Sequence, residues 1–252
     1  MIAPQTQFLT APDGARLAYR LRPGAGPTVV WLGGFRSDMT GSKAAHLDAW
    51  AARTGRGFLR FDYFAHGESD GAFEAGTISR WREDSLMAID ALSDGPLVLV
   101  GSSMGGWMAL LAALARPERV KGLLLIAPAP DFTSRLMAPS LPDDARRSLA
   151  ETGRWERPSP YGDGPSVITQ SLLDDGARWA LLDQPITLPI PVRILQGMED
   201  ADVPWRHALA LVEALDSADV RLTLVKGGDH RLSSPSDLVL LEQALEALLA
   251  RV

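Results

Sequence analysis

The chain has 252 residues, a net charge of −6 at pH 7, and hydrophobic and charged fractions of 46% and 22%. A chain of this length can bury a substantial apolar core, and the composition argues against a long disordered segment. The acidic balance and the lack of a basic run exclude nucleic acid as the main partner. Because there is no cysteine, disulfides, thiolate zinc sites and a cysteine nucleophile are excluded together.

Apolar residues alternate along the chain between short runs typical of strands and spaced patterns typical of helices. Strands that alternate with helices form right-handed βαβ units, so we predict a mostly parallel eight-stranded sheet flanked by helices. The first two strands flank Asp13-Gly14, a pair that favours a tight hairpin turn. We predict strands at residues 5–10, 15–21, 28–32, 58–61, 96–100, 120–126, 192–196 and 220–225, and helices at residues 43–53, 79–91, 107–115, 205–214 and 237–249.

A long stretch without a clear strand separates the sixth and seventh predicted strands. Its roughly sixty-five residues are too many for a bare connection within a compact domain. We therefore predict a small helical cap at residues 129–187, inserted after the sixth strand and lying over the active end of the sheet. The core then comprises residues 1–128 and 188–252. Within the cap, helical patterns occupy residues 143–152 and 166–182.

The N-terminal residues 1–5 show neither a basic start with an apolar core nor an arginine-rich amphipathic pattern. We therefore expect no targeting peptide and a cytoplasmic location. The longest apolar runs, such as residues 97–100 and 123–127, are too short to span a bilayer, so we expect no stable membrane insertion.

The segment Gly101-Ser102-Ser103-Met104-Gly105 joins a predicted strand to a predicted helix. A glycine two residues on either side of a serine allows a sharp turn that exposes the hydroxyl, as in a nucleophile elbow. Only Ser103 has that spacing, which makes it the candidate nucleophile. The alternative is a serine that only caps the following helix.

A serine nucleophile needs a histidine base, which in turn needs a carboxylate to orient it. Two of the four histidines, His46 and His66, precede Ser103, and His207 lies on a helix that we expect to be exposed. His230 follows the strand at residues 220–225, at the sheet end where the elbow also emerges. We therefore predict His230 as the base.

The loop after the strand at residues 192–196 offers three carboxylates, Glu199, Asp200 and Asp202. The residues alone do not choose among them, because an acidic loop at a strand end is often a solvated turn. Asp202 could instead cap the helix that begins near Pro204. Asp131, after the preceding strand, is a weaker alternative for the acid.

Acyl transfer also needs amide donors that stabilise an oxyanion. We predict the backbone N–H groups of Met104, directly after the nucleophile, and of Phe35, in the loop Gly33-Gly34-Phe35. The glycine pair is also compatible with an ordinary tight turn. Residues 62–69 are interpreted as a structural turn in which His66 is a hydrogen-bonded loop residue.

Candidate substrate-binding residues lie beside the elbow and in the cap. Arg36 could pair with an anionic substrate, although an exposed arginine is usually only solvated. Apolar cap residues could line an acyl slot or could serve packing alone. No phosphate-binding loop and no metal-ligand cluster is visible, so we expect no cofactor and no metal. The substrate-binding candidates are Gly34, Arg36, Phe132, Leu136, Trp155 and Trp179.

The elbow, the acid loop and the histidine loop together resemble the α/β-hydrolase superfamily over essentially the whole chain. The chain is most similar to the group of mitochondrial palmitoyl-protein thioesterases and acyl-glucuronide esterases, with their bacterial relatives. This resemblance implies the α/β-hydrolase fold, with Ser103 as nucleophile, His230 as base, and Asp200, three residues before Val203-Pro204, as acid. The similar segments are residues 61–63, 101–107, 116–118, 197–198 with Asp200 and 203–205, and 229–231.

We accordingly predict a cofactor-free serine hydrolase that acts on a small-molecule ester, an acyl thioester or an acylated protein through an acyl-enzyme intermediate. The same triad could instead serve carbon–carbon bond hydrolysis or perhydrolysis, depending on what the cap admits. A further alternative is a binding module for small ligands that has kept the fold and lost turnover. Dehalogenase chemistry is disfavoured, because it would need a carboxylate at position 103.

Overall fold

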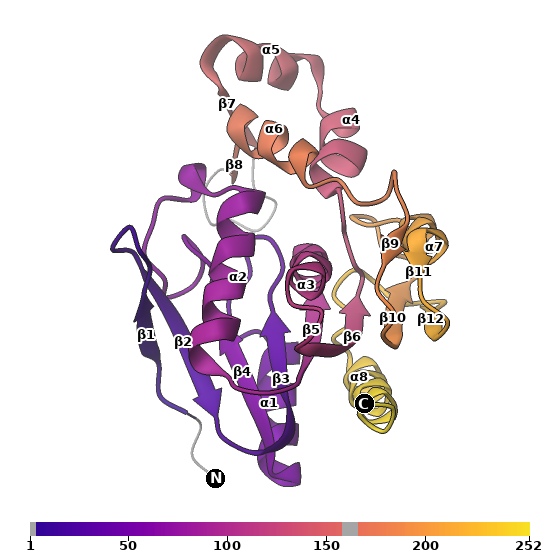
Figure 1. Cartoon of the computed structure of the whole chain (residues 1–252). Coiled ribbons are helices and arrows are strands. Elements are labelled where there is room, and N and C mark those ends of the chain that lie inside the picture. The colour runs from indigo at the N-terminus through magenta and orange to yellow at the C-terminus, as the bar shows by residue number, and fades with distance from the viewer. Residues whose placement is uncertain (1–3, 158–165) are drawn as a thin grey trace.

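An eight-stranded sheet forms the centre of the computed structural model, which describes residues 4–157 and 166–252. The strand order is β1-β2-β4-β3-β5-β6-β10-β12 (Figure 1). The pairs β1/β2 and β2/β4 are antiparallel and all other neighbours are parallel, which confirms the predicted mostly parallel sheet. Its strands are β1 (Gln7–Thr10), β2 (Arg16–Arg22), β3 (Ala25–Leu32), β4 (Arg56–Phe61), β5 (Leu97–Ser102), β6 (Val120–Ile126), β10 (Val192–Gly197) and β12 (Val220–Val225).

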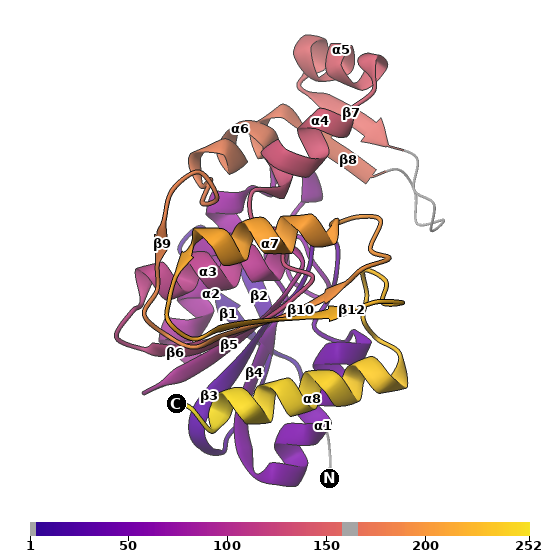
Figure 2. The same ribbon diagram turned by 90° about the vertical axis from the view of Figure 1, so that its right-hand side faces the viewer.

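Helices cover both faces of the sheet (Figure 2). Because side chains alternate along a strand, Val98 and Val100 of β5 join the apolar cluster under one set of helices, while Leu97 and Leu99 join the other. Both faces are therefore apolar, as expected of a parallel sheet. One face packs against α1 (Ser42–Thr54) and α8 (Pro235–Leu249), and the other against α2 (Ile78–Leu92), α3 (Met104–Ala115) and α7 (Trp205–Ala214).

Local signals set where these helices begin. Ser234 and Asp237 form a capping box at the start of α8, so this helix begins two residues before the predicted residue 237. Thr77 accepts a hydrogen bond from the Arg80 amide at the start of α2. α3 begins directly after Ser103, so the sharp turn at the end of β5 is also the helix start.

The segment between β6 and β10 lies over the carboxyl edge of the sheet (Figure 1). The predicted helix at residues 166–182 is wrong at its start, because Ser166–Thr169 forms a strand that pairs antiparallel with Arg154–Arg157. The described elements are η2 (Thr133–Met137), α4 (Ala138–Ser140), α5 (Asp143–Thr152), β7 (Arg154–Arg157), β8 (Ser166–Thr169), α6 (Gln170–Arg178) and β9 (Ile186–Thr187).

Two short elements complete the chain. η1 (Phe73–Ala75) precedes α2, and β11 (Leu215–Asp216) pairs in parallel with β9. β9 thus lies within the predicted cap range, residues 129–187, yet pairs with a strand of the core; the division at residues 128/129 and 187/188 stays a prediction. No helix within the described ranges is long and apolar enough to cross a membrane.

Candidate active site

The turn between β5 and α3 places Ser103 in a strained backbone conformation, with φ 56° and ψ −120°. The turn is tight because glycines stand on both sides of it. A Cβ on Gly101 would lie 2.2 Å from the Gly105 carbonyl oxygen, and one on Gly105 would lie 2.0 Å from the Leu32 carbonyl oxygen. Only glycine fits at either position, and the serine at the apex is the residue that the strand presents at the carboxyl edge of the sheet.

Three side chains from separate strand-end loops meet at this edge. The Ser103 Oγ lies 3.1 Å from His230 Nε2, and His230 Nδ1 lies 2.8 Å from Asp200 Oδ2. Ser103 follows β5, Asp200 follows β10 and His230 follows β12, as expected for a site at the carboxyl ends of parallel strands. The arrangement can pass a proton from the serine to the histidine while the carboxylate orients the ring.

Asp200 is buried and accepts several hydrogen bonds. Its Oδ1 accepts from the amides of Asp202 and Val203, at 2.9 and 2.8 Å, and its Oδ2 accepts from Gln196 Nε2 at 3.0 Å. Burial alone would raise the pKa of Asp200, but hydrogen bonds from His230, Val203 and Gln196 hold it below its usual value. The carboxylate is therefore ionised at neutral pH.

Gln196 contributes to the site without having been singled out from the sequence. It is fully buried, and its amide donates both to Asp200 and to the Val203 carbonyl at 3.0 Å. The available signal is an amide that follows the apolar pair Ile194-Leu195 near the end of the strand, shortly before the acidic loop. Asp202 does not cap the next helix. α7 begins at Trp205, and its N-cap residue is Pro204, with no side-chain hydrogen bond to the cap.

Asp200, Asp202 and His230 offer ligand atoms within 4.8 Å of one another, a spacing compatible with a metal ion. Both oxygens of Asp200 already accept hydrogen bonds, and the histidine nitrogen nearest to them is bonded to Asp200. These donors would have to be displaced before a cation could bind. The geometry favours a hydrogen-bonded acid and base over a metal centre.

Two backbone amides flank Ser103. Met104 is the first residue of α3, and a helix leaves its first N–H groups without intrahelical acceptors. On the other side, a Cβ on Gly34 would lie 3.4 Å from the Ser103 Cβ, so the loop after β3 packs against the serine. The next amide along, that of Phe35, has no acceptor among the described residues. Both amides are thus available near the serine hydroxyl.

His207 and Asp131 are both buried. His207, expected on an exposed helix, is only 8% exposed, and its Nε2 lies 2.7 Å from the Pro130 carbonyl oxygen. The expectation of exposure is wrong because His207 is buried against a segment 77 positions away in the chain, which also supplies its hydrogen-bond acceptor. Asp131 is fully buried and accepts the amides of Leu181 and Leu182, so its carboxylate fastens the cap segment.

The predicted substrate-binding residues fall into different environments. The Phe132 ring packs against Phe35 and Trp107, with ring centroids 5.6 and 5.8 Å apart, and Leu136 packs against the same cluster. Trp155 instead packs in the separate apolar cluster of the cap. Trp179 donates from its indole to Ser79 Oγ at 2.8 Å. Their roles toward a substrate stay predictions.

Arg36 has its guanidinium 4.8 Å from the centroid of the Phe73 ring, and its backbone amide donates to His66 Nε2 at 3.1 Å. This contact makes His66 a second residue that the sequence analysis left without a role at the site. The residues around His66 indicate a turn, but they do not indicate which distant backbone amide its ring will accept a hydrogen bond from.

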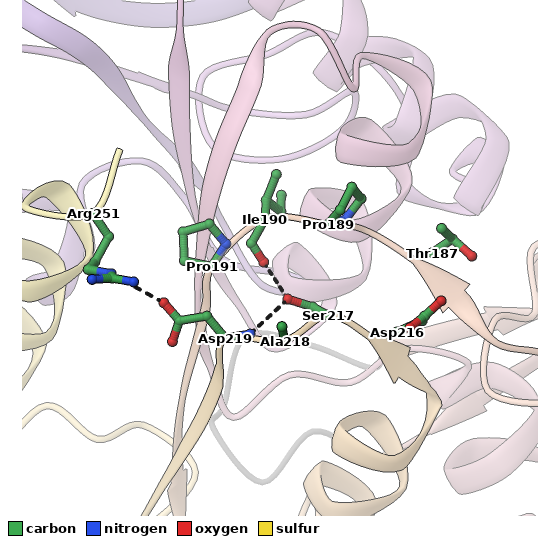
Figure 3. Close-up of a pocket in the computed structure, with 9 residues that line it drawn as sticks. All are labelled: Thr187, Pro189, Ile190, Pro191, Asp216, Ser217, Ala218, Asp219 and Arg251. Atoms are coloured by element: carbon green, nitrogen blue, oxygen red, sulfur yellow. Dashed lines mark hydrogen bonds and ion pairs between the residues drawn. The ribbon is translucent and has the colours of Figure 1, made fainter.

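A cavity of about 360 Å³ lies elsewhere, beside Asp219 and Arg251 (Figure 3). Its walls come from the segments that precede β10 and β12, so it opens at the amino ends of these strands. This is the opposite edge of the sheet from Ser103. The cavity is therefore separate from the candidate active site.

The fold and the three converging side chains define an α/β hydrolase. A family model described as the alpha/beta hydrolase fold matches residues 39–160. The human mitochondrial palmitoyl-protein thioesterase ABHD10 is 37% identical over 246 residues, covering 97% of this chain and 80% of that protein. This chain belongs to the α/β-hydrolase family, and its similarity to thioesterases supports an esterase or thioesterase role.

Solved structures agree with this assignment. Mouse alpha/beta hydrolase domain-containing protein 10 superposes with a TM-score of 0.89 at 36% identity, covering 98% of each chain. A crystal structure of a protein from Agrobacterium vitis S4 superposes with a TM-score of 0.93 at 46% identity, covering 98% of this chain and 100% of that one. The similarity extends over the sheet, its helices and the segment between β6 and β10.

Proposed function

We propose that this protein is a serine hydrolase that cleaves carboxylic esters or thioesters of acyl groups through an acyl-enzyme intermediate. The observation that supports this most directly is the continuous hydrogen-bonded path from Ser103 through His230 to Asp200, with distances of 3.1 and 2.8 Å. A serine hydroxyl is a weak nucleophile at neutral pH, and this constellation is the one that activates it. The thioesterase relatives favour acyl thioesters, including acylated proteins, as the substrate class.

In the acylation step, Ser103 Oγ bonds to the substrate's carbonyl carbon while its proton passes to His230 Nε2. Asp200 accepts the Nδ1–H hydrogen bond and stabilises the positive ring. The carbonyl oxygen becomes an oxyanion that accepts hydrogen bonds from the Phe35 and Met104 amides, each contributing about 3 kcal/mol in the transition state. Collapse breaks the bond to the leaving group, which takes the proton from His230.

In the deacylation step, a water molecule replaces the departed alcohol or thiol. His230 removes a proton from the water as the water oxygen bonds to the acyl carbon. The second oxyanion uses the same two amides. Its collapse breaks the ester bond to Ser103, returns the proton to the serine oxygen and releases the carboxylic acid.

The test is the Ser103→Ala variant on p-nitrophenyl esters and on an acyl thioester of a cysteine-containing peptide. We expect kcat/KM to fall about 10⁴- to 10⁶-fold with an unchanged thermal midpoint, because the nucleophile alone is removed. Wild-type protein should also react covalently with a fluorophosphonate at Ser103, which mass spectrometry of the labelled peptide would detect. Turnover retained by the variant would contradict the proposal.

A substrate screen addresses the remaining alternatives. Carbon–carbon bond hydrolysis and perhydrolysis use the same residues and would show as turnover of diketones or of acids with hydrogen peroxide, without ester cleavage. A non-catalytic binding module would leave Ser103 unlabelled by the fluorophosphonate. The cytoplasmic location and the absence of a cofactor stay predictions, and the curated thioesterase relatives are mitochondrial proteins.

A further inference from the structure

The loop that contains Phe35 is fastened to a second loop that follows β4. We call residues 33–40 the oxyanion loop and residues 62–70 the β4 loop. The Arg36 amide of the oxyanion loop donates to His66 Nε2 at 3.1 Å, and His66 Nδ1 lies 3.0 Å from the Phe64 carbonyl oxygen. Since one ring nitrogen accepts from an amide, the other donates to the carbonyl, and the ring is neutral. Burial lowers the pKa of His66, which favours this neutral form.

The β4 loop is itself fixed by helix α2. Asp84 accepts the Phe64 amide at 2.8 Å, and the Trp81 indole donates to the Phe64 carbonyl at 3.1 Å. His66 is only 3% exposed and packs edge-on against Trp81, with ring centroids 5.3 Å apart. The histidine ring therefore has one orientation, set by a helix that belongs to the core.

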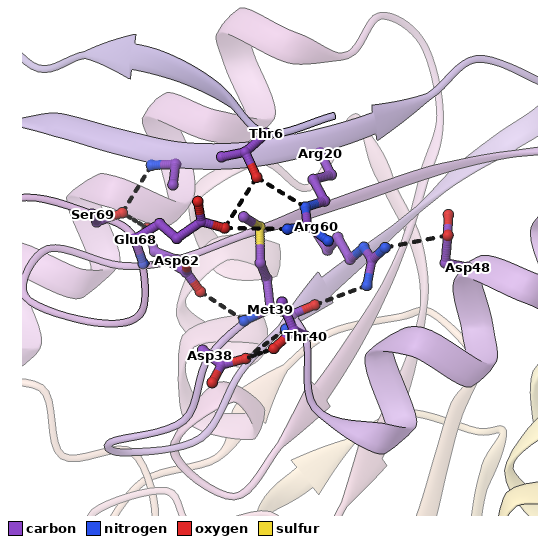
Figure 4. Close-up of polar contacts among 11 residues, drawn as sticks. Thr6, Arg20, Asp38, Met39, Thr40, Asp48, Arg60, Asp62, Glu68 and Ser69 are labelled. Atoms are coloured by element: carbon purple, nitrogen blue, oxygen red, sulfur yellow. Dashed lines mark hydrogen bonds and ion pairs between the residues drawn. The ribbon is translucent and has the colours of Figure 1, made fainter. Parts of the chain in front are cut away.

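A second contact joins the same two loops (Figure 4). The buried carboxylate of Asp62 accepts the Met39 amide at 2.6 Å and the Glu68 amide at 2.9 Å. Burial raises the pKa of Asp62 to about 6, so the group is ionised and accepts both bonds at neutral pH. The oxyanion loop is thus attached at Arg36 and at Met39, and both acceptors lie in the β4 loop.

Backbone strain indicates what these attachments maintain. Arg36 has φ 58°, in the left-handed region that costs a non-glycine residue roughly 1–2 kcal/mol. It is the third residue of a turn closed by a 3.1 Å hydrogen bond from the Ser37 amide to the Gly34 carbonyl. Phe35 is the second residue of that turn, so the orientation of the Arg36 amide determines the conformation at Phe35. Without an acceptor on the Arg36 amide, the strained turn loses the hydrogen bond that joins it to the β4 loop.

We propose that His66 is a positioning residue for hydrolysis, whose acceptor nitrogen orients the Arg36 peptide and thereby directs the neighbouring Phe35 amide at the oxyanion. The inference rests on the proposed function, since it concerns the donor that would stabilise the oxyanion formed at Ser103. His66 does not contact the reacting atoms, and it acts only through the turn that it fixes. Its effect therefore belongs to the transition state rather than to substrate binding.

The test compares His66→Ala and His66→Gln with the wild-type protein. Because one oxyanion donor is misplaced, we expect kcat for p-nitrophenyl butyrate to fall about tenfold to hundredfold in His66→Ala, with little change in KM. The Gln Oε1 can accept the Arg36 amide from nearly the position of Nε2, so His66→Gln should recover most of kcat. An alkyl trifluoromethyl ketone, which adds to Ser103 and forms an oxyanion, should lose affinity in His66→Ala by the same factor as kcat.

Ile89→Ala is the control for lost stability, because Ile89 is a fully buried residue near the other end of α2. It should lower the thermal midpoint without lowering kcat. Three results would overturn the inference: a kcat loss in Ile89→Ala equal to that in His66→Ala, no recovery in His66→Gln, or a ketone affinity that does not follow kcat. If the wild-type protein neither cleaves esters nor binds the ketone, the proposed function is overturned. If the wild-type protein is active and both His66 variants have the same kcat, only the inference is overturned.

Discussion

The core and the cap segment differ in the size of the apolar clusters that stabilise them. On each face of the sheet, helices bury a large apolar cluster, and the two clusters share the apolar side chains of β5 and β6 between them. The cap has a small cluster of its own, whose described buried members are Leu141, Ala145 and Leu149. A large, densely packed core holds the loops at its edge more firmly than a small cluster does, because a small cluster opens locally at a lower free-energy cost. The three side chains of the candidate site, Ser103, Asp200 and His230, lie on loops of the core.

Apolar contacts attach the cap to that core, since Phe132 and Leu172 belong to the larger cluster, and polar contacts add to them. Asp131, shortly after β6, accepts the Leu181 and Leu182 amides, each at 2.8 Å, so this contact joins the two ends of the cap segment. Asp175 of α6 accepts the amide and the hydroxyl of Ser79 at the start of α2, both at 2.7 Å. The comparison therefore predicts that substitutions of Ser103, Asp200 or His230 change turnover and that substitutions in the large apolar clusters change global stability. Substitutions at the polar contacts of the cap should change substrate selection.

The largest expected effect is that of Asp200→Asn, on the core side of the comparison. Asparagine keeps the size of the side chain but can present its amide to His230, which favours the wrong tautomer of the ring. We expect kcat to fall about 10⁴-fold, measured with a p-nitrophenyl ester. Asp202→Asn is the matched control, because Asp202 is exposed and contacts Asp200 only through its backbone amide. Equal losses in both variants would contradict the role of Asp200 as the acid.

An intermediate effect should distinguish the two apolar clusters directly. Leu99→Ala opens a cavity in the core and should lower the free energy of unfolding by about 3 kcal/mol, measured by denaturant titration. Leu149→Ala should change that value by less than about 1 kcal/mol but should accelerate hydrogen exchange in α5, because the cap can open locally. Similar losses of global stability in the two variants would show that the cap and the core unfold as one unit.

The smallest expected effect concerns the attachment at Asp131. Asp131→Ala leaves the Leu181 and Leu182 amides without their acceptor, so the cap should lose its fixed position over the site. We expect KM for a long-chain acyl thioester to rise by about tenfold, as for the loss of one hydrogen bond to a charged group. Turnover of p-nitrophenyl acetate, whose acyl group is too short to need the cap, should stay unchanged. A loss of acetate turnover would instead place Asp131 among the groups that shape the core site.

Most of the core could be predicted from the sequence because its signals are local. The apolar period of each strand, the paired glycines around Ser103 and the turn before His230 all lie within a few residues of the feature that they predict. The choice between Asp200 and Asp202 was different. It depends on which carboxylate accepts hydrogen bonds from Gln196 and His230 in the folded chain, and residue spacing alone does not indicate that.

The contacts that the sequence did not reveal join distant segments. His207 is buried because a carbonyl 77 positions away accepts its hydrogen bond, and the attachment of His66 to Arg36 spans 30 positions. Residues 166–169 form β8 and not the predicted start of a helix. A strand of four residues is stabilised by its partner, β7, and its own sequence is too short to show a period. Each of these features is a property of the folded chain and has no local pattern.

The point at which the cap segment leaves the sheet has an evolutionary consequence. β6 and β10 are direct neighbours and run parallel, so the chain leaves the sheet at the carboxyl end of β6 and re-enters it at the amino end of β10. An insertion there can grow, shrink or be exchanged while the spacing of the strands before Ser103, Asp200 and His230 stays constant. Under the proposed function, a change in this connection would alter which substrates reach the site while Ser103, Asp200 and His230 keep their places at the strand ends.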